Sequence, residues 1–128
     1  MTAEQELGAT YLKSKKIFTK DDAVYGIVSA IYLNKVYPKR YTDKEYFYIY
    51  YYIKQPKEEL NLYLNGTPPV TKEELHRKNN FTRFTSIKNE WSNYFLVSFE
   101  KDDSNETLSL TFENSLSSEA LLKYQKDE

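Results

Sequence analysis

The chain of 128 residues contains no cysteine, which excludes disulfide bonds, thiolate nucleophiles and cysteine-ligated metal centres. It has only three glycines and four prolines, so collagen-like and flexible low-complexity classes are excluded as well. The formal net charge is −1, and no overall positive field favours nucleic acid or an anionic membrane. No apolar run approaches the roughly 20 residues that a membrane-spanning helix needs. These absences exclude several chemistries and leave the cellular compartment open.

Residues for catalysis or cofactor binding are scarce. Histidine occurs once, as His76 in a charged segment, which excludes a zinc site built from two or three histidines. Glycines occur only at Gly8, Gly26 and Gly66, so neither a Gly-x-Ser-x-Gly nucleophile elbow nor a glycine-rich phosphate loop is present. We therefore predict a solvated surface histidine, no catalytic residues, no metal site, no cofactor and no enzymatic activity.

Local clusters of charge are interpreted as polar surface. The acidic pairs at 58–59 and 73–74 are neighbours in sequence, whereas glycoside hydrolysis needs two carboxyl groups facing each other across a cleft. Residues 102–106 offer oxygen ligands suited to calcium but lack the glycine-bearing loop of twelve residues, and a charged hairpin tip explains them as well. Residues 34–44 carry four cations, one acid and two interleaved tyrosines, which is typical of a basic loop and does not predict nucleic-acid binding here.

Aromatic residues, by contrast, are abundant. They make up 16% of the chain and include 13 tyrosines, a content opposed to disorder. The length suits one hydrophobic core, so we predict a single domain over residues 1–128. The polar residues 1–10 could form a flexible N-terminal arm, and the pattern over residues 4–18 is ambiguous.

Alternation of apolar and polar side chains is the strongest pattern and predicts seven or eight short strands. We expect strands at 23–33, 45–54, 60–64, 81–87, 93–101, 107–113 and 119–125. A short helix is the alternative for the last of these. Thr71 followed by Glu74 matches a capping box and predicts one helical turn over Lys72–Arg77. The spacing predicts an all-β fold, an antiparallel β-sandwich with one short helical turn.

The strand predicted at 45–54 carries a row of tyrosines on one face. The row consists of Tyr46, Tyr48, Tyr50 and Tyr52, because successive side chains of a strand point to opposite faces. Tyrosine supplies rigid contact area with a polar tip and is enriched at interfaces. The row is our candidate binding surface. The alternative is that it packs against a covering loop or the other sheet.

The C-terminal half carries a resemblance to a known family. It rests on Leu64-Asn65-Gly66, Trp91–Phe99, Leu110–Asn114 and the ending Leu122–Glu128. Over these residues the chain resembles a small family of lipoproteins from Campylobacter-type bacteria, whose mature domain is a variant immunoglobulin-like sandwich. The resemblance implies export and a lipid anchor on an N-terminal cysteine, which this chain does not contain. By analogy with immunoglobulin-like domains, Tyr94 would form a tyrosine corner.

Together these observations predict a non-enzymatic domain of the bacterial cell envelope, periplasmic or lipid-anchored to the outer membrane. We expect it to bind a protein or a ligand or to serve a structural role, with membrane contact only through a lipid anchor. The alternative is a small-molecule carrier with an apolar pocket between the sheets and the tyrosines at its mouth. The ligand, the partner and the oligomeric state are left open.

Overall fold

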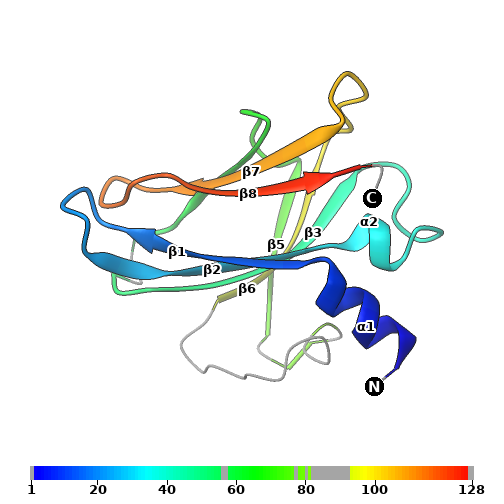
Figure 1. Ribbon diagram of the computed structural model, residues 1–128, viewed down its shortest axis with the longest axis horizontal. Coiled ribbons are helices and arrows are strands. Elements are labelled where there is room, and N and C mark those ends of the chain that lie inside the picture. The colour runs from blue at the N-terminus through cyan, green and yellow to red at the C-terminus, as the bar shows by residue number, and fades with distance from the viewer. Residues whose placement is uncertain (1, 56–57, 77, 80, 82–92, 127–128) are drawn as a thin grey trace.

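A computed structural model describes residues 2–55, 58–76, 78–79, 81 and 93–126. In these residues eight strands form two antiparallel sheets that pack face to face, with two short helices at one end (Figure 1). The predicted all-β antiparallel sandwich is therefore confirmed. Its immunoglobulin-like character stays a prediction.

The larger sheet has five strands in the order β1-β2-β3-β6-β5, and the smaller has three in the order β4-β7-β8. The larger sheet contains β1 (Leu12–Phe18), β2 (Val24–Tyr32), β3 (Glu45–Ile53), β6 (Asn93–Phe99) and β5 (Thr71–Leu75). The smaller sheet contains β4 (Asn61–Leu64), β7 (Thr107–Glu113) and β8 (Ala120–Gln125). The sheets meet beside β1, where the Ser118 N–H donates to the Phe18 carbonyl at 2.8 Å. The strand predicted at 119–125 is present as β8, so that prediction is confirmed.

The space between the sheets is filled by one cluster of buried side chains, here called the inner cluster. Phe47 on β3 lies at its centre, with ring centroids 5.1 Å from Tyr32, 5.9 Å from Phe99 and 5.5 Å from Tyr124. The Tyr124 hydroxyl donates to the Ala30 carbonyl and so joins β8 of one sheet to β2 of the other. Each large apolar side chain buried in this way contributes about 1.5–3 kcal/mol to folding.

A second cluster covers part of the outer face of the larger sheet, and we call it the outer cluster. It is built from Ile31, Leu33, Val36, Tyr41, Tyr48, Phe81 and Tyr94. The short helix α2 (Leu33–Val36), which the sequence did not predict, contributes two of these side chains. Strand β2 is covered on both faces, because Ala30 is buried in the inner cluster and Ile31 in the outer cluster.

One member of the outer cluster carries an unsatisfied polar atom. Within the described part of the chain, the Tyr41 hydroxyl is buried and has no hydrogen-bond partner. A buried donor of this kind costs about 1–3 kcal/mol. We therefore expect Tyr41→Phe to raise the free energy of unfolding by about 1 kcal/mol in urea denaturation.

The matched control is Tyr124→Phe, because the Tyr124 hydroxyl is also buried but donates to a carbonyl. This variant should lose about 1–2 kcal/mol. Equal destabilisation by the two substitutions would contradict the assignment of an unpaired hydroxyl at Tyr41.

The N-terminal segment of ambiguous pattern divides into a helix and a strand. Helix α1 spans Ala3–Thr10, where an arm was considered, and β1 follows it. A reciprocal cap begins the helix: the Gln5 N–H donates to the Thr2 hydroxyl at 3.1 Å, and the Thr2 N–H donates to the Gln5 side chain at 2.9 Å.

The predicted helical turn over Lys72–Arg77 is wrong, because Thr71–Leu75 forms strand β5 and pairs antiparallel with β6. The Thr71 hydroxyl bonds the Ser98 hydroxyl on β6 and does not cap a helix. The Lys72 ammonium on β5 also lies 4.5 Å from the centre of the Phe95 ring on β6. Of the strand predicted at 81–87, Phe81 lies in a turn and the rest lies outside the described residues.

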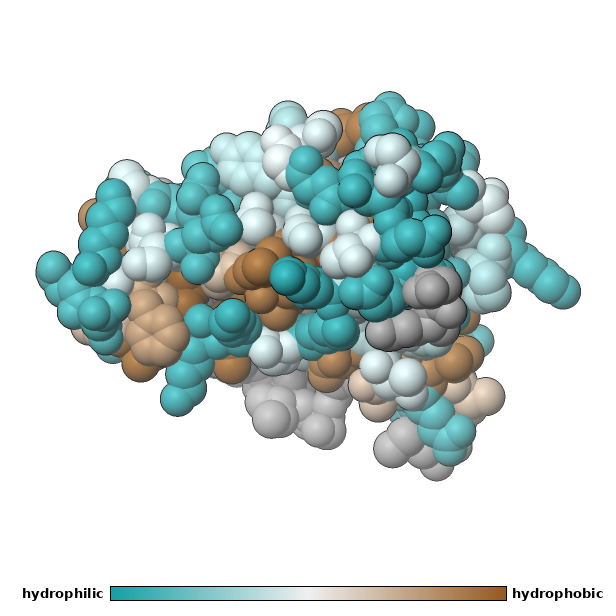
Figure 2. Space-filling view, turned by 45° about the horizontal axis from the view of Figure 1, so that its top comes forward, coloured by the Kyte–Doolittle hydropathy of each residue, from teal (hydrophilic) through white to brown (hydrophobic). Residues whose placement is uncertain are grey.

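The face of the molecule shown in Figure 2 is mainly hydrophilic, and hydrophobic residues gather on it only in small, separate groups. Among the described residues, six large apolar side chains are more than a third exposed: Leu7, Phe18, Val24, Ile27, Val70 and Leu116. Among the described helices, none has the length and apolarity to cross a membrane.

Candidate functional site

A polar cleft opens at the end of the sandwich where the β2–β3 and β6–β7 connections meet the C-terminal end of β8. Its volume is about 510 Å³, within the range of small-molecule sites. We call it the end cleft. It is lined by Tyr11, Tyr32, Asn34, Lys35, Pro38, Tyr41, Thr42, Glu45, Lys101, Asp103 and Lys126.

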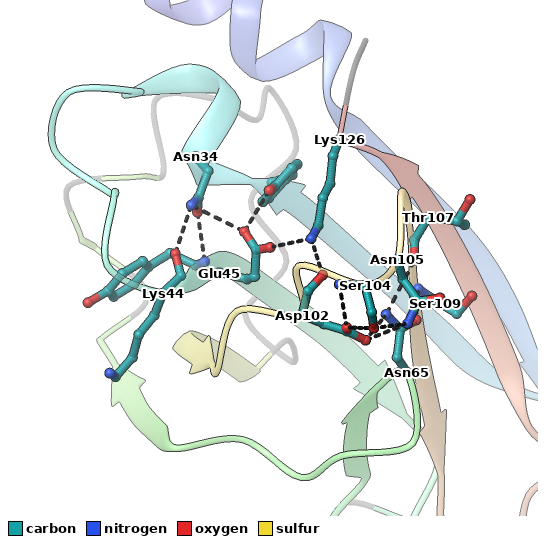
Figure 3. A network of polar contacts seen from close by, with 12 residues as sticks. Asn34, Lys44, Glu45, Asn65, Asp102, Ser104, Asn105, Thr107, Ser109 and Lys126 are labelled. Atoms are coloured by element: carbon teal, nitrogen blue, oxygen red, sulfur yellow. Dashed lines mark hydrogen bonds and ion pairs between the residues drawn. The ribbon is translucent and has the colours of Figure 1, made fainter.

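Glu45 is the buried acid of the end cleft, and it is only 3% exposed. It begins β3 in phase with Phe47 and Ile49, so its side chain points toward the space between the sheets. The Tyr32 hydroxyl donates to Glu45 Oε1 at 2.7 Å, and the Asn34 amide donates to the same oxygen at 3.3 Å (Figure 3). These donors replace the water that a buried carboxylate loses.

The second carboxylate oxygen of Glu45 faces Lys126, the residue that directly follows β8 of the other sheet. Lys126 Nζ lies 3.7 Å from Glu45 Oε2 and also donates to the Asp102 carbonyl. The Lys35 ammonium in turn donates to the Lys126 carbonyl. The segment after β8 is therefore tied to both loops that flank the cleft. Burial, reinforced by the hydrogen bond to Glu45, raises the pKa of Tyr32 well above its usual value, so Tyr32 acts as a donor.

Asn34 fixes the backbone that presents Glu45. Its amide nitrogen donates to the Lys44 carbonyl at 2.7 Å, and its amide oxygen accepts from the Tyr46 N–H at 2.8 Å (Figure 3). Asn34 lies in α2, directly after β2, so this side chain closes the connection from β2 to β3. The arrangement holds Glu45 in place through backbone contacts on both of its neighbours.

A second polar group, centred on Asp102, braces the β6–β7 turn. Hydrogen bonds from Ser104, Asn105 and Asn65 lower the pKa of Asp102 to about 2. Asn65 has a positive φ of 49° and, with Gly66 at 82°, forms the tight turn after β4. Its side-chain oxygen accepts from the Ser109 N–H at 2.9 Å. The predicted hairpin tip is wrong, because β6 and β7 pair with other strands and lie in different sheets, so residues 102–106 form a charged turn that connects the two sheets. The described residues hold no group of three or more metal-ligating side chains.

The four tyrosines predicted to form a row do lie on one face of β3, the outer face. Tyr48 is fully buried in the outer cluster, 5.0 Å from the Phe81 ring. The other three are partly exposed. Tyr46 lies nearest the end cleft, because its ring centre is 4.6 Å from that of Tyr41. One tyrosine of the row, Tyr48, is therefore covered by other side chains. Binding by Tyr46, Tyr50 and Tyr52 stays a prediction.

His76 and Tyr94, the two other residues considered from the sequence, lie away from the end cleft lining. His76 is exposed, and its Nδ1 accepts from the Lys78 N–H at 3.2 Å, so the predicted surface histidine is confirmed. Tyr94 packs in the outer cluster with its ring 5.9 Å from that of Tyr50. Its assignment as a tyrosine corner stays a prediction.

No protein-family model matches the chain, and no curated protein matches its sequence.

Proposed function

We propose that the protein is a non-enzymatic binding domain of the bacterial cell envelope, and that it takes a small polar ligand in the end cleft. The observation that carries the proposal is the preorganised wall of this cleft. Glu45, Asn34 and Lys126 are held by hydrogen bonds before any ligand arrives. A wall fixed in advance lowers the entropy that ligand binding would otherwise cost.

The packing between the sheets does not favour the alternative of an apolar carrier. Inner-cluster side chains such as Phe47, Leu110 and Phe112 have no exposed surface and fill the interior. The end cleft is lined mainly by charged and polar residues, and most of the surface that it exposes is polar. A cavity at the opposite end of the sandwich exposes more apolar surface, but it lies outside the space between the sheets.

The envelope location is supported by the resemblance over Trp91–Phe99 and the other segments named above. It is tested by fractionating bacterial cells that produce the complete gene product. We expect the protein in the periplasmic or outer-membrane fraction, and recovery in the cytosol would contradict this part of the proposal.

The binding function is tested with a variant that fills the end cleft. Thr42 is exposed and lines it, so Thr42→Trp places a bulky ring in the opening. The matched control is Ser115→Trp, which fills the cavity of about 410 Å³ at the opposite end, here called the far-end cavity. Thermal unfolding is measured with amino acids, monosaccharides and their carboxylated and phosphorylated derivatives, with circular dichroism as the check on folding.

We expect at least one compound to stabilise the wild-type protein and Ser115→Trp, but not Thr42→Trp. At about ten times its Kd, a ligand adds about 1.4 kcal/mol of stability. A panel without any stabilising compound, or equal stabilisation of all three proteins, would contradict binding in the end cleft.

A further inference from the structure

Among the described residues, two of the ammonium groups that line the end cleft form no ion pair with a carboxylate. Lys126 pairs with Glu45, and at the same end of the sandwich Lys44 pairs with Glu100 at 3.8 Å. Lys35 and Lys101, in contrast, make no ion pair within the described part of the chain. Lys35 is half-buried, and a backbone carbonyl holds its ammonium group in place.

The acceptors of the end cleft are largely engaged already. Glu45 receives Tyr32, Asn34 and Lys126, and the Asn34 side chain uses both its oxygen and its nitrogen in hydrogen bonds. Asp103 is the second acid of the lining and is exposed. Three lysines against two acids give the lining a net positive charge, although the whole chain is at −1. The hydrogen-bonding capacity that remains is mainly that of donors, which suits an anionic ligand.

The rest of the lining offers flat, weakly polar surfaces beside these charges. Tyr11 is partly exposed and Pro38 is exposed, and both line the end cleft. An aromatic face packs well against a rigid ring that carries C–H groups on one side. The Thr42 hydroxyl adds a group that can donate to or accept from a ligand hydroxyl.

We infer that the end cleft binds an acidic sugar, with its negative group held by Lys35 and Lys101 and its ring against Tyr11 and Pro38. This inference rests on the proposed function and names the ligand class for the same site. A uronic acid and a sugar phosphate share the required chemistry, a negative charge on a hydroxylated ring. The probes below distinguish these two sources.

The test is isothermal titration calorimetry at about 50 mM salt, where charge interactions are weakly screened. The probes are glucuronate, glucose 6-phosphate, neutral glucose and inorganic phosphate. The variants are Lys35→Gln and Lys101→Gln, and the control is Lys20→Gln, which removes a lysine from the far-end cavity. Circular dichroism confirms that each variant is folded.

We expect at least one charged sugar to bind about tenfold more tightly than glucose, and more tightly than phosphate. Lys35→Gln and Lys101→Gln should each weaken this binding about three- to tenfold, since a charge-assisted hydrogen bond is lost. Lys20→Gln should leave it unchanged. Preference for glucuronate would identify a carboxylated sugar, and preference for glucose 6-phosphate a phosphorylated one.

Binding of glucose as tight as that of both charged sugars would overturn the inference, as would an equal loss from Lys20→Gln. Phosphate that binds as tightly as glucose 6-phosphate, with no binding of glucuronate, would overturn the role of the sugar ring. If neither sugar binds but a compound of another class stabilises the wild type and not Thr42→Trp, the inference fails and the proposed function survives. If no compound is sensitive to Thr42→Trp, both fail.

Discussion

Replacing Gly26 with alanine is expected to destabilise the protein by about 3 kcal/mol or more, one of the two largest effects that we predict. Gly26 lies in β2 opposite Ile53 of β3. A Cβ added there would lie 2.1 Å from the Tyr52 carbonyl oxygen and 2.9 Å from the Ile53 Cα. Both are backbone atoms, so the two central strands would have to separate. Urea denaturation, or the soluble yield if the variant does not fold, measures the effect.

Gly66→Ala is the matched control for this prediction. The new Cβ would meet no atom within 4 Å, and the cost comes only from the positive φ of 82°. An L-residue in this region costs about 1 kcal/mol. Equal destabilisation at the two positions would show that strand separation is not the cause at Gly26.

Replacing Glu45 with alanine is expected to cost about 3 kcal/mol or more. The substitution leaves the Tyr32 hydroxyl and the Lys126 ammonium without their shared acceptor. The Lys126 side chain is only 22% exposed, so water replaces the lost carboxylate poorly. Guanidinium or urea denaturation measures the loss, and Glu45→Gln, which keeps one oxygen acceptor, should lose less.

Glu100→Ala provides the comparison, because Glu100 also pairs with a lysine but its side chain is 66% exposed. An exposed pair of this kind contributes about 0–1 kcal/mol. If Glu45→Ala costs no more than Glu100→Ala, the network in Figure 3 does not hold the end of the sandwich together.

Alternation was enough to predict most of the sandwich. At 45–54, 93–101 and 107–113 the apolar side chains recur every second residue, and strands β3, β6 and β7 lie there. β5 was missed because its sequence, Thr-Lys-Glu-Glu-Leu, has polar side chains in both phases and resembles a capped helical turn. Pairing with β6 decides its conformation, and tertiary contacts of this kind override local propensity.

The site was less predictable than the fold. The tyrosine row was placed correctly on one face, but the burial of Tyr48 depends on α2 and Phe81, which alternation does not locate. One signal for the end cleft was present in the sequence. Glu45 is an acid in phase with Phe47 and Ile49, and a charge at a core position requires partners. Those partners come from distant segments, so their identity depends on how the two sheets meet.

The most direct test of binding in the end cleft is an amide proton–nitrogen correlation NMR titration of the wild-type protein with glucuronate and, separately, with glucose 6-phosphate. We predict that the largest shifts fall on residues around the cleft, such as Asn34, Glu45 and Lys101. Signals at the far-end cavity, such as those of Asp21 and Leu116, should stay in place. Shifts concentrated at the far-end cavity or along Tyr50 and Tyr52, or no shifts with either sugar, would contradict binding in the end cleft.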